Sequence, residues 1–188
     1  MISRVYISHC ENDENLAIEI SDSLYRIGIE CFVMMYNKSP GLTHANKVSY
    51  GIRNSECLVA LISRDGQNSA IVGQEIGLAA GIDLLIIPLL ERDAVLPYLL
   101  ENLKPIDFTK ERLEDAIGVL IRTFRELSKL EWLKIKCPGC NEEMTQYLTL
   151  QEEVDHALEN RSYLETICTY CQSKISLDPR TFMPLQRT

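Results

Sequence analysis

Residues 57–75 read CLVALI SRDGQN SAIVGQE, which divides into an apolar run, a polar link and the start of a helix. The apolar run 57–62 has the length and composition of a buried β-strand, and the Gly- and Asn-containing link predicts a loop. A strand that passes through a loop into a helix is the repeating unit of a parallel sheet, whose ligands bind at the carboxyl ends of the strands. Glu75 lies about two turns into the predicted helix. It is therefore the first candidate for a functional side chain.

The rest of the first 131 residues repeats this alternation of strand and helix. Strands are predicted at 4–8, 29–34, 57–62, 84–90 and 103–108, and helices at 13–28, 43–54, 69–80 and 110–130. Strands joined through helices imply right-handed crossovers and a parallel sheet, for which the flavodoxin-like order 2-1-3-4-5 fits this length. Pro88 lacks a backbone N–H, so we expect a strand end or an irregular ladder at that position.

Composition limits the classes of function. The chain has 188 residues, 46% of them hydrophobic, and a formal net charge of −8, which argues against sequence-independent binding of nucleic acid. The longest apolar run, 84–90, is far shorter than the roughly 18 residues of a membrane span, and no signal peptide is recognised. Seven cysteines, three of them scattered in apolar segments, indicate a reducing compartment. We therefore expect a cytoplasmic protein without membrane contact.

The last part of the chain carries two CxxC pairs. Cys137 and Cys140 are separated by 27 residues from Cys168 and Cys171, and four thiolates in this arrangement are suited to tetrahedral Zn²⁺. Strands are predicted around them at 133–136, 144–150, 163–167 and 174–177, with a short inserted helix at 152–160. A redox role for either CxxC lacks the expected thioredoxin-like βαβ context. The predicted fold is thus α/β, a flavodoxin-like five-stranded parallel sheet in residues 1–127 followed by a small β-rich zinc ribbon in residues 128–188.

The first of these parts resembles a TIR domain, the module of Toll and interleukin-1 receptors, and in particular the prokaryotic type. The resemblance rests on five short motifs in the expected order: VYISH at 5–9 with Asp13, GIECF at 28–32 with Pro40-Gly41, SECLVALIS at 55–63, SAIVGQE at 69–75, and IIP at 86–88. The family pattern Ser-x-Trp-x-x-x-Glu is met at Ser69 and Glu75. Ile71 stands where the family has Trp, and it shares a helix face with Glu75.

The resemblance implies an enzyme that cleaves the bond between nicotinamide and ribose in NAD, with Glu75 as the catalytic residue. It releases ADP-ribose or a cyclic ADP-ribose. Substrate contacts are expected from residues on the loops after the first three strands and from the following helix: Ser8, His9, Cys10, Lys38, Ser69 and Ile71.

The leaving group explains why one carboxylate suffices. Glycosidases use two, because an alcohol leaving group must be protonated. Nicotinamide leaves from a pyridinium cation as a neutral molecule and needs no acid. What remains is to stabilise an oxocarbenium-like sugar, which an anionic side chain does.

The resemblance also implies self-assembly, because in relatives the loop after strand 2 of a neighbouring copy completes the site. Two other functions compete: a non-catalytic TIR scaffold, favoured by the missing Trp, and a zinc-ribbon nucleic-acid sensor with TIR output, disfavoured by the negative charge. Simpler interpretations also remain for single residues, since Ser69 suits a helix N-cap and His9 an ordinary buried histidine. A response-regulator receiver fits Lys104-Pro105, but it needs acidic residues where residues 8–10 and Ser63 stand.

Overall fold

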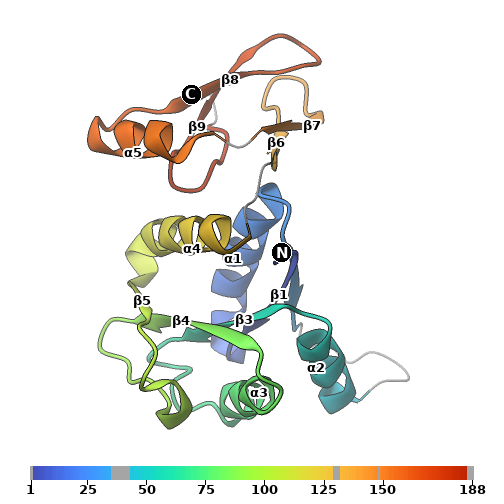
Figure 1. The fold of residues 1–188 in the computed structure, drawn as a ribbon, viewed down its shortest axis with the longest axis vertical. Helices are drawn as coiled ribbons and strands as arrows, with labels where there is room; N and C mark the ends of the chain where they lie inside the picture. The colour runs from blue at the N-terminus through green and yellow to red at the C-terminus, as the bar shows by residue number, and fades with distance from the viewer. Residues whose placement is uncertain (1, 35–42, 129–131, 148, 186–188) are drawn as a thin grey trace.

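The computed structural model describes residues 2–34, 43–128, 132–147 and 149–185, and its first part is a single parallel sheet between two helical layers (Figure 1). The sheet contains β1 (Arg4–Ser8), β2 (Glu30–Val33), β3 (Cys57–Ile62), β4 (Leu85–Glu91) and β5 (Ile106–Phe108). Their order is β2-β1-β3-β4-β5 and every pair is parallel, which confirms the flavodoxin-like topology. The helices between them are α1 (Glu14–Arg26), α2 (His44–Arg53), α3 (Ala70–Gly81) and α4 (Leu113–Ser128). Single turns of 3₁₀-helix lie at Glu11–Asp13, Tyr98–Leu100 and Lys110–Arg112.

The buried strand β3 divides the core into two halves because successive side chains point to opposite faces of the sheet. Val59 and Leu61 join the core with α1 and α4, whereas Leu58, Ala60 and Ile62 join the core with α2 and α3. On β1 the same alternation places Tyr6 with α2 and α3. The carboxyl ends of β1 and β3 lie near the start of α3.

Two predictions about strands need correction. Pro88 lies inside β4 and pairs with Ala60 of β3 in an uninterrupted register. The missing N–H is tolerated because β5 pairs with β4 only from Leu89 onward, so β4 has one strand neighbour at Pro88 in the described structure. The fifth strand is also shorter than predicted, since it starts at Ile106, directly after Pro105.

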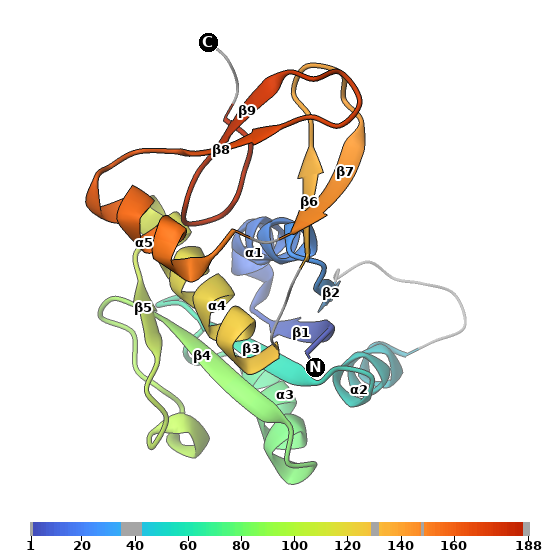
Figure 2. The same cartoon turned by 45° about the horizontal axis from the view of Figure 1, so that its top comes forward.

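The C-terminal part consists of two antiparallel hairpins and one helix. β6 (Trp132–Lys136) pairs with β7 (Glu143–Tyr147), and β8 (Leu164–Ile167) pairs with β9 (Lys174–Leu177). Helix α5 (Gln151–Glu159) lies between the hairpins, as the sequence predicted. Figures 1 and 2 show this part on the side of the sheet that α1 and α4 cover.

Helix α4 carries several of the contacts with the C-terminal part. Arg122 forms an ion pair with Asp155 of α5 at 2.7 Å, and Arg180 forms one with Asp115 at 2.8 Å. The guanidinium of Arg125 lies 5.5 Å from the ring centroid of Phe182, which is buried. The apolar core is continuous across this contact. The domain boundary at residue 127 therefore remains a prediction from the sequence. In the structure the two parts pack against each other.

Within the described ranges, every helix is too short or too polar to cross a lipid bilayer.

Candidate functional site

Glu75 is buried on α3, with 3% of its surface exposed, and is held by two hydroxyl groups of β1. The phenol of Tyr6 donates a hydrogen bond to Oε1 at 2.7 Å, and the hydroxyl of Ser8 donates one to Oε2 at 2.6 Å. Glu75 is therefore not a solvated surface residue. Both of its oxygen atoms are oriented by neutral donors at the carboxyl end of a central strand.

The electrostatics of Glu75 result from two opposed effects. Burial raises the pKa of the Glu75 carboxyl, because the charged form loses hydration. The hydrogen bonds from Ser8 and Tyr6 lower the pKa, because they favour the ionised form, but burial is the larger effect. Glu75 forms no ion pair with any residue that the structure describes. An anion in this position is thus poorly compensated, which favours contact with a developing positive charge.

Of the three predicted substrate contacts after strand 1, Ser8 is the one that binds Glu75. His9 is buried, with Nδ1 3.2 Å from the carbonyl oxygen of Ile7, and burial lowers the pKa of its imidazole. Cys10 is buried as well, and its thiol donates to Asp13 at 3.0 Å. Burial raises the pKa of this thiol, so Cys10 is protonated at neutral pH. The three neighbours thus have three different surroundings.

The remaining predicted contacts lie on or before α3. The Ser69 hydroxyl accepts a hydrogen bond from the backbone N–H of Val72 at 3.4 Å and caps the helix. Ile71 is 37% exposed and lies one turn before Glu75, so its side chain reaches the surface beside the buried carboxylate. Lys38 and the Pro40-Gly41 pair lie outside the described residues. Their roles stay predictions.

Tyr6 is a residue of the site that the sequence pattern does not single out. Residues 4–8 have the pattern of a core strand, and an aromatic residue in such a run needs no further explanation. The signal that was present is the spacing of two between Tyr6 and Ser8, which puts both hydroxyls on one face of a strand. That face is the one toward Glu75.

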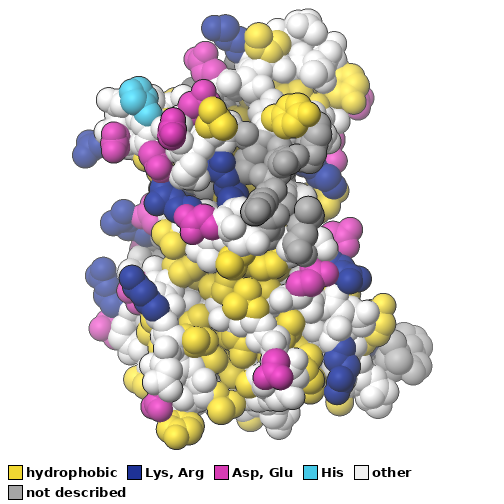
Figure 3. All heavy atoms as spheres, viewed as in Figure 1, with side chains coloured by type: hydrophobic (Ala, Val, Ile, Leu, Met, Phe, Trp, Pro, Cys, Tyr) yellow, Lys and Arg dark blue, Asp and Glu magenta, His cyan; other side chains and the backbone are white. Residues whose placement is uncertain are grey.

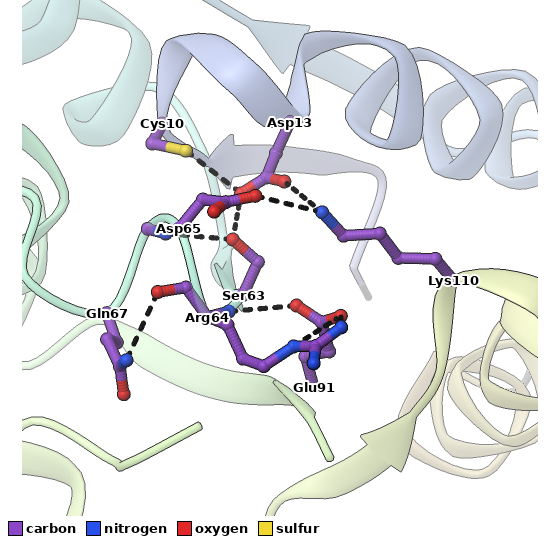
Figure 4. Close-up of polar contacts among 9 residues, drawn as sticks. Cys10, Asp13, Ser63, Arg64, Asp65, Gln67, Glu91 and Lys110 are labelled. Carbon is purple, nitrogen blue, oxygen red and sulfur yellow. Dashed lines mark hydrogen bonds and ion pairs between the residues drawn. The ribbon is translucent and has the colours of Figure 1, made fainter. Parts of the chain in front are cut away.

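A second polar cluster ties three loops together at the same edge of the sheet (Figure 4). Asp13 is fully buried and accepts hydrogen bonds from Ser63 Oγ at 2.5 Å and from the Cys10 thiol. Lys110 approaches the other oxygen of Asp13 to 3.9 Å and contacts Asp65 at 3.1 Å. The loops after β1, β3 and β5 thus meet at one carboxylate.

A residue at the end of β4 also holds the loop that follows β3. Glu91 is 2% exposed and accepts hydrogen bonds from the backbone N–H of Arg64 at 2.8 Å and from its guanidinium at 3.1 Å. The link 63–69 that leads into α3 is therefore anchored at both carboxylates, and Figure 4 shows both contacts. This anchoring positions the helix that carries Glu75.

Replacing Asp13 by Asn tests whether this cluster supports the fold. Asn keeps the shape but removes the charge that faces Lys110, and its amide group contributes a donor where the Asp13 carboxylate had only acceptors. We expect the free energy of unfolding to fall by about 1–3 kcal/mol. Chemical denaturation of the full chain measures this, with Asp65→Asn as the control because Asp65 is about half exposed. Equal stability of Asp13→Asn and the parent would contradict the proposed anchoring.

The four predicted zinc ligands come together. The Sγ atoms of Cys137, Cys140, Cys168 and Cys171 all lie within 4.8 Å of one another. The distances from Cys137 to Cys171 and from Cys140 to Cys168 are both 3.7 Å. Tetrahedral zinc with bonds of about 2.3 Å places sulfur atoms about 3.8 Å apart, close to these two distances, so the cluster is compatible with this metal. The backbone N–H of Gly139 also points to Cys137 Sγ at 3.3 Å, as expected where a thiolate needs a donor.

Comparisons with known proteins agree with the topology. Residues 5–121 match the family model described as TIR domain. The TIR domain of the Toll-related receptor TRR-2 from Hydra magnipapillata is similar, with 26% identity and a TM-score of 0.54 over 66% of this chain and 99% of that chain. The TIR domains of the activated Roq1 resistosome, which recognises the pathogen effector XopQ, share 13% identity and a TM-score of 0.53 over 65% and 99%.

A metazoan TIR-STING receptor from C. gigas, solved with 2′,3′-cGAMP, is similar over 62% of this chain and 38% of that chain, with 23% identity and a TM-score of 0.51. Comparison with curated proteins gives no match. The family match ends at residue 121, before the cysteine cluster begins.

Proposed function

The chain belongs to the TIR domain family, and we propose on that basis that it cleaves the nicotinamide–ribose bond of NAD with Glu75 as the catalytic carboxylate. The observation that carries the proposal is the setting of Glu75, a buried acid held by Tyr6 and Ser8 at the ligand-binding edge of the sheet. A structural role alone does not require a poorly compensated acid at this position.

The chemistry needs no second acid. The electron pair of the glycosidic bond goes to the ring nitrogen, and nicotinamide leaves as a neutral molecule. Positive charge then develops on C1′ and the ring oxygen of the ribose, where the Glu75 carboxylate stabilises it. Water adds to C1′ and releases a proton to give ADP-ribose, or a nitrogen of the adenine adds instead and gives a cyclic product.

Self-assembly is part of the proposal. An apolar groove runs beside the first half of β4, where Ile86, Pro88, Leu103 and Val119 contribute to its lining. Figure 3 shows hydrophobic side chains gathered on this face between α4 and α3. A patch of this kind marks a contact surface, and we propose a second copy of the chain as its occupant. The similar Roq1 domains are part of a resistosome, which supports an assembled state.

The direct test is to incubate the concentrated full chain with NAD and to follow nicotinamide release by chromatography over a series of protein concentrations. We expect the rate per chain to rise with concentration, because each site is completed by a neighbour. Intact NAD at every concentration overturns the proposal in favour of a scaffold. A constant rate per chain from a monomer overturns the assembly requirement alone.

Ile71 is the observation that favours a TIR scaffold as the second candidate function. An aliphatic side chain packs beside nicotinamide but does not stack on it.

We expect Ile71→Trp to lower the KM for NAD about 5–10-fold with little change in kcat, since aromatic pairs contribute about 0.5–1.5 kcal/mol. Ile71 is at the surface, so the larger ring is accommodated, and Ile18→Trp serves as a control at a similarly exposed position. An unchanged KM would contradict the placement of nicotinamide beside residue 71.

The C-terminal part is proposed to be a zinc-held module for protein contact. Four thiolates and one Zn²⁺ add a net charge of −2 to a part that is already acidic, which disfavours nucleic acid. Tight binding of duplex DNA or RNA at physiological salt would overturn this assignment.

A further inference from the structure

We infer that Tyr6 is a positioning residue for Glu75 and that Gly51 of α2 sets the position of the Tyr6 ring. The inference rests on the proposed function, because it concerns the ionised form of Glu75 that the proposed reaction uses. It links α2, through the Tyr6 ring, to the Glu75 carboxylate on α3.

The first observation is the approach of α2 to Tyr6. Gly51 is buried in α2, and a Cβ atom built on it would lie 2.8 Å from Tyr6 Cε2 and 2.9 Å from Tyr6 Cδ2. Real Cβ atoms do not occupy such distances, so any larger residue displaces the ring or the helix. Glycine in a helix interior costs about 0.5–1 kcal/mol relative to alanine, and this contact supplies the reason for its presence.

The second observation is the hydrogen bond at the other end of the ring. The Tyr6 phenol donates to Glu75 Oε1 at 2.7 Å, and Tyr6 is 1% exposed. Its ring thus fills the space between the backbone of α2 and the carboxylate of α3. A shift of α2 moves the ring, and the ring moves the donor.

The consequence concerns the protonation of Glu75. Among the residues that the structure describes, the Tyr6 phenol and the Ser8 hydroxyl, both on β1, donate to this carboxylate, and both lower its pKa. Removing or displacing the phenol takes away one of the two hydrogen bonds that counteract the effect of burial, so the pKa of Glu75 rises. Because the reaction uses the carboxylate, activity then requires a higher pH.

The test compares Tyr6→Phe, Gly51→Ala and the double variant in the full chain. Glutamate labelled with ¹³C at Cδ reports the pKa of Glu75 by NMR, and the resonance is assigned by its loss in Glu75→Gln. We expect both single variants to raise this pKa and to lower nicotinamide release about 10-fold at neutral pH, with recovery at higher pH. Gly77→Ala is the matched glycine control, because a Cβ there meets nothing within 4 Å.

The double variant separates positioning from packing. Phe keeps the ring that Gly51→Ala displaces but lacks the donor, so adding Gly51→Ala to Tyr6→Phe is expected to lower the Tm without raising the pKa of Glu75 further. An unchanged pKa of Glu75 in Tyr6→Phe, or in Gly51→Ala, overturns the inference even if both variants lose activity. The NMR titration decides this point even if the parent leaves NAD intact, which would overturn the proposed function instead.

Discussion

Glu75→Gln is expected to lower nicotinamide release by about 10³-fold, because it removes the negative charge that stabilises the oxocarbenium-like ribose. Gln is close to Glu in shape and keeps an acceptor oxygen for one of the two hydroxyl donors, Tyr6 and Ser8, at the same buried position. The variant therefore isolates the charge from the packing. The rate constant at saturating NAD is measured for both proteins at equal concentration and equal zinc content.

The same variant is expected to be more stable than the parent at neutral pH. The pKa of Glu75 is raised in the folded chain, so between the ordinary glutamate value and the folded value the folded state binds more protons than the unfolded state. Stability of the parent therefore falls as pH rises through this window. Glu75→Gln lacks this loss, and its advantage disappears below about pH 4, where Glu75 is protonated in both states.

Calorimetry at pH 4 and pH 7 measures this difference. An increase in stability of 1 kcal/mol raises the Tm of a chain of this size by about 2–4 °C. A lower Tm of Glu75→Gln at pH 7 would show that the two hydroxyl bonds outweigh burial, and it would remove the argument from a poorly compensated charge.

The second large effect is expected from the zinc ligands. Cys168 is fully buried, and Cys168→Ser removes one of the four sulfur atoms that lie within 4.8 Å of one another. Structural zinc binds small peptide modules with about 10–16 kcal/mol, so its loss is expected to unfold residues 132–185. Metal analysis of the parent is expected to give one Zn²⁺ per chain.

Hydrogen exchange locates the damage. Because Arg122 and Arg125 contact residues of the C-terminal part, faster exchange is expected to extend from β6–β9 into α4. Cys31→Ser is the matched control, since burial raises the pKa of Cys31 to about 12 and its thiol lies outside the cluster. Substoichiometric zinc, or unchanged exchange in Cys168→Ser, would contradict a structural metal site.

The strand–helix alternation was predictable from residues 1–131 because each element has a strong period of its own. β3 is a continuous apolar run, and α3 directly follows Ser69, which caps it. The two errors in the strands have a common cause. Pro88 and Pro105 show in the sequence that a backbone N–H is missing, but they do not show whether a neighbouring strand would have accepted a hydrogen bond from it. That depends on the length of β5, which local sequence does not determine.

The site was predictable only in part. Glu75 stands out because it is the one acidic residue of the predicted helix 69–80, which follows an apolar strand. The spacing of Tyr6 and Ser8 puts both hydroxyls on one face of β1, but the approach of Gly51 to the Tyr6 ring gives no signal in the sequence, because it is a contact between β1 and α2 that depends on packing. Asp13 and Ser63 are 50 residues apart, and the topology alone brings them together. The sequence predicts that Glu75 lies at the carboxyl edge of the sheet, and the packing determines which side chains contact it.

Mass spectrometry of the products formed from NAD by the full chain is the most direct test of the account. Cleavage of the nicotinamide–ribose bond predicts free nicotinamide together with ADP-ribose or cyclic ADP-ribose, from the parent and not from Glu75→Gln. Intact NAD, cleavage at the pyrophosphate to nicotinamide mononucleotide and AMP, or equal product from both proteins would contradict the assignment of this reaction to Glu75.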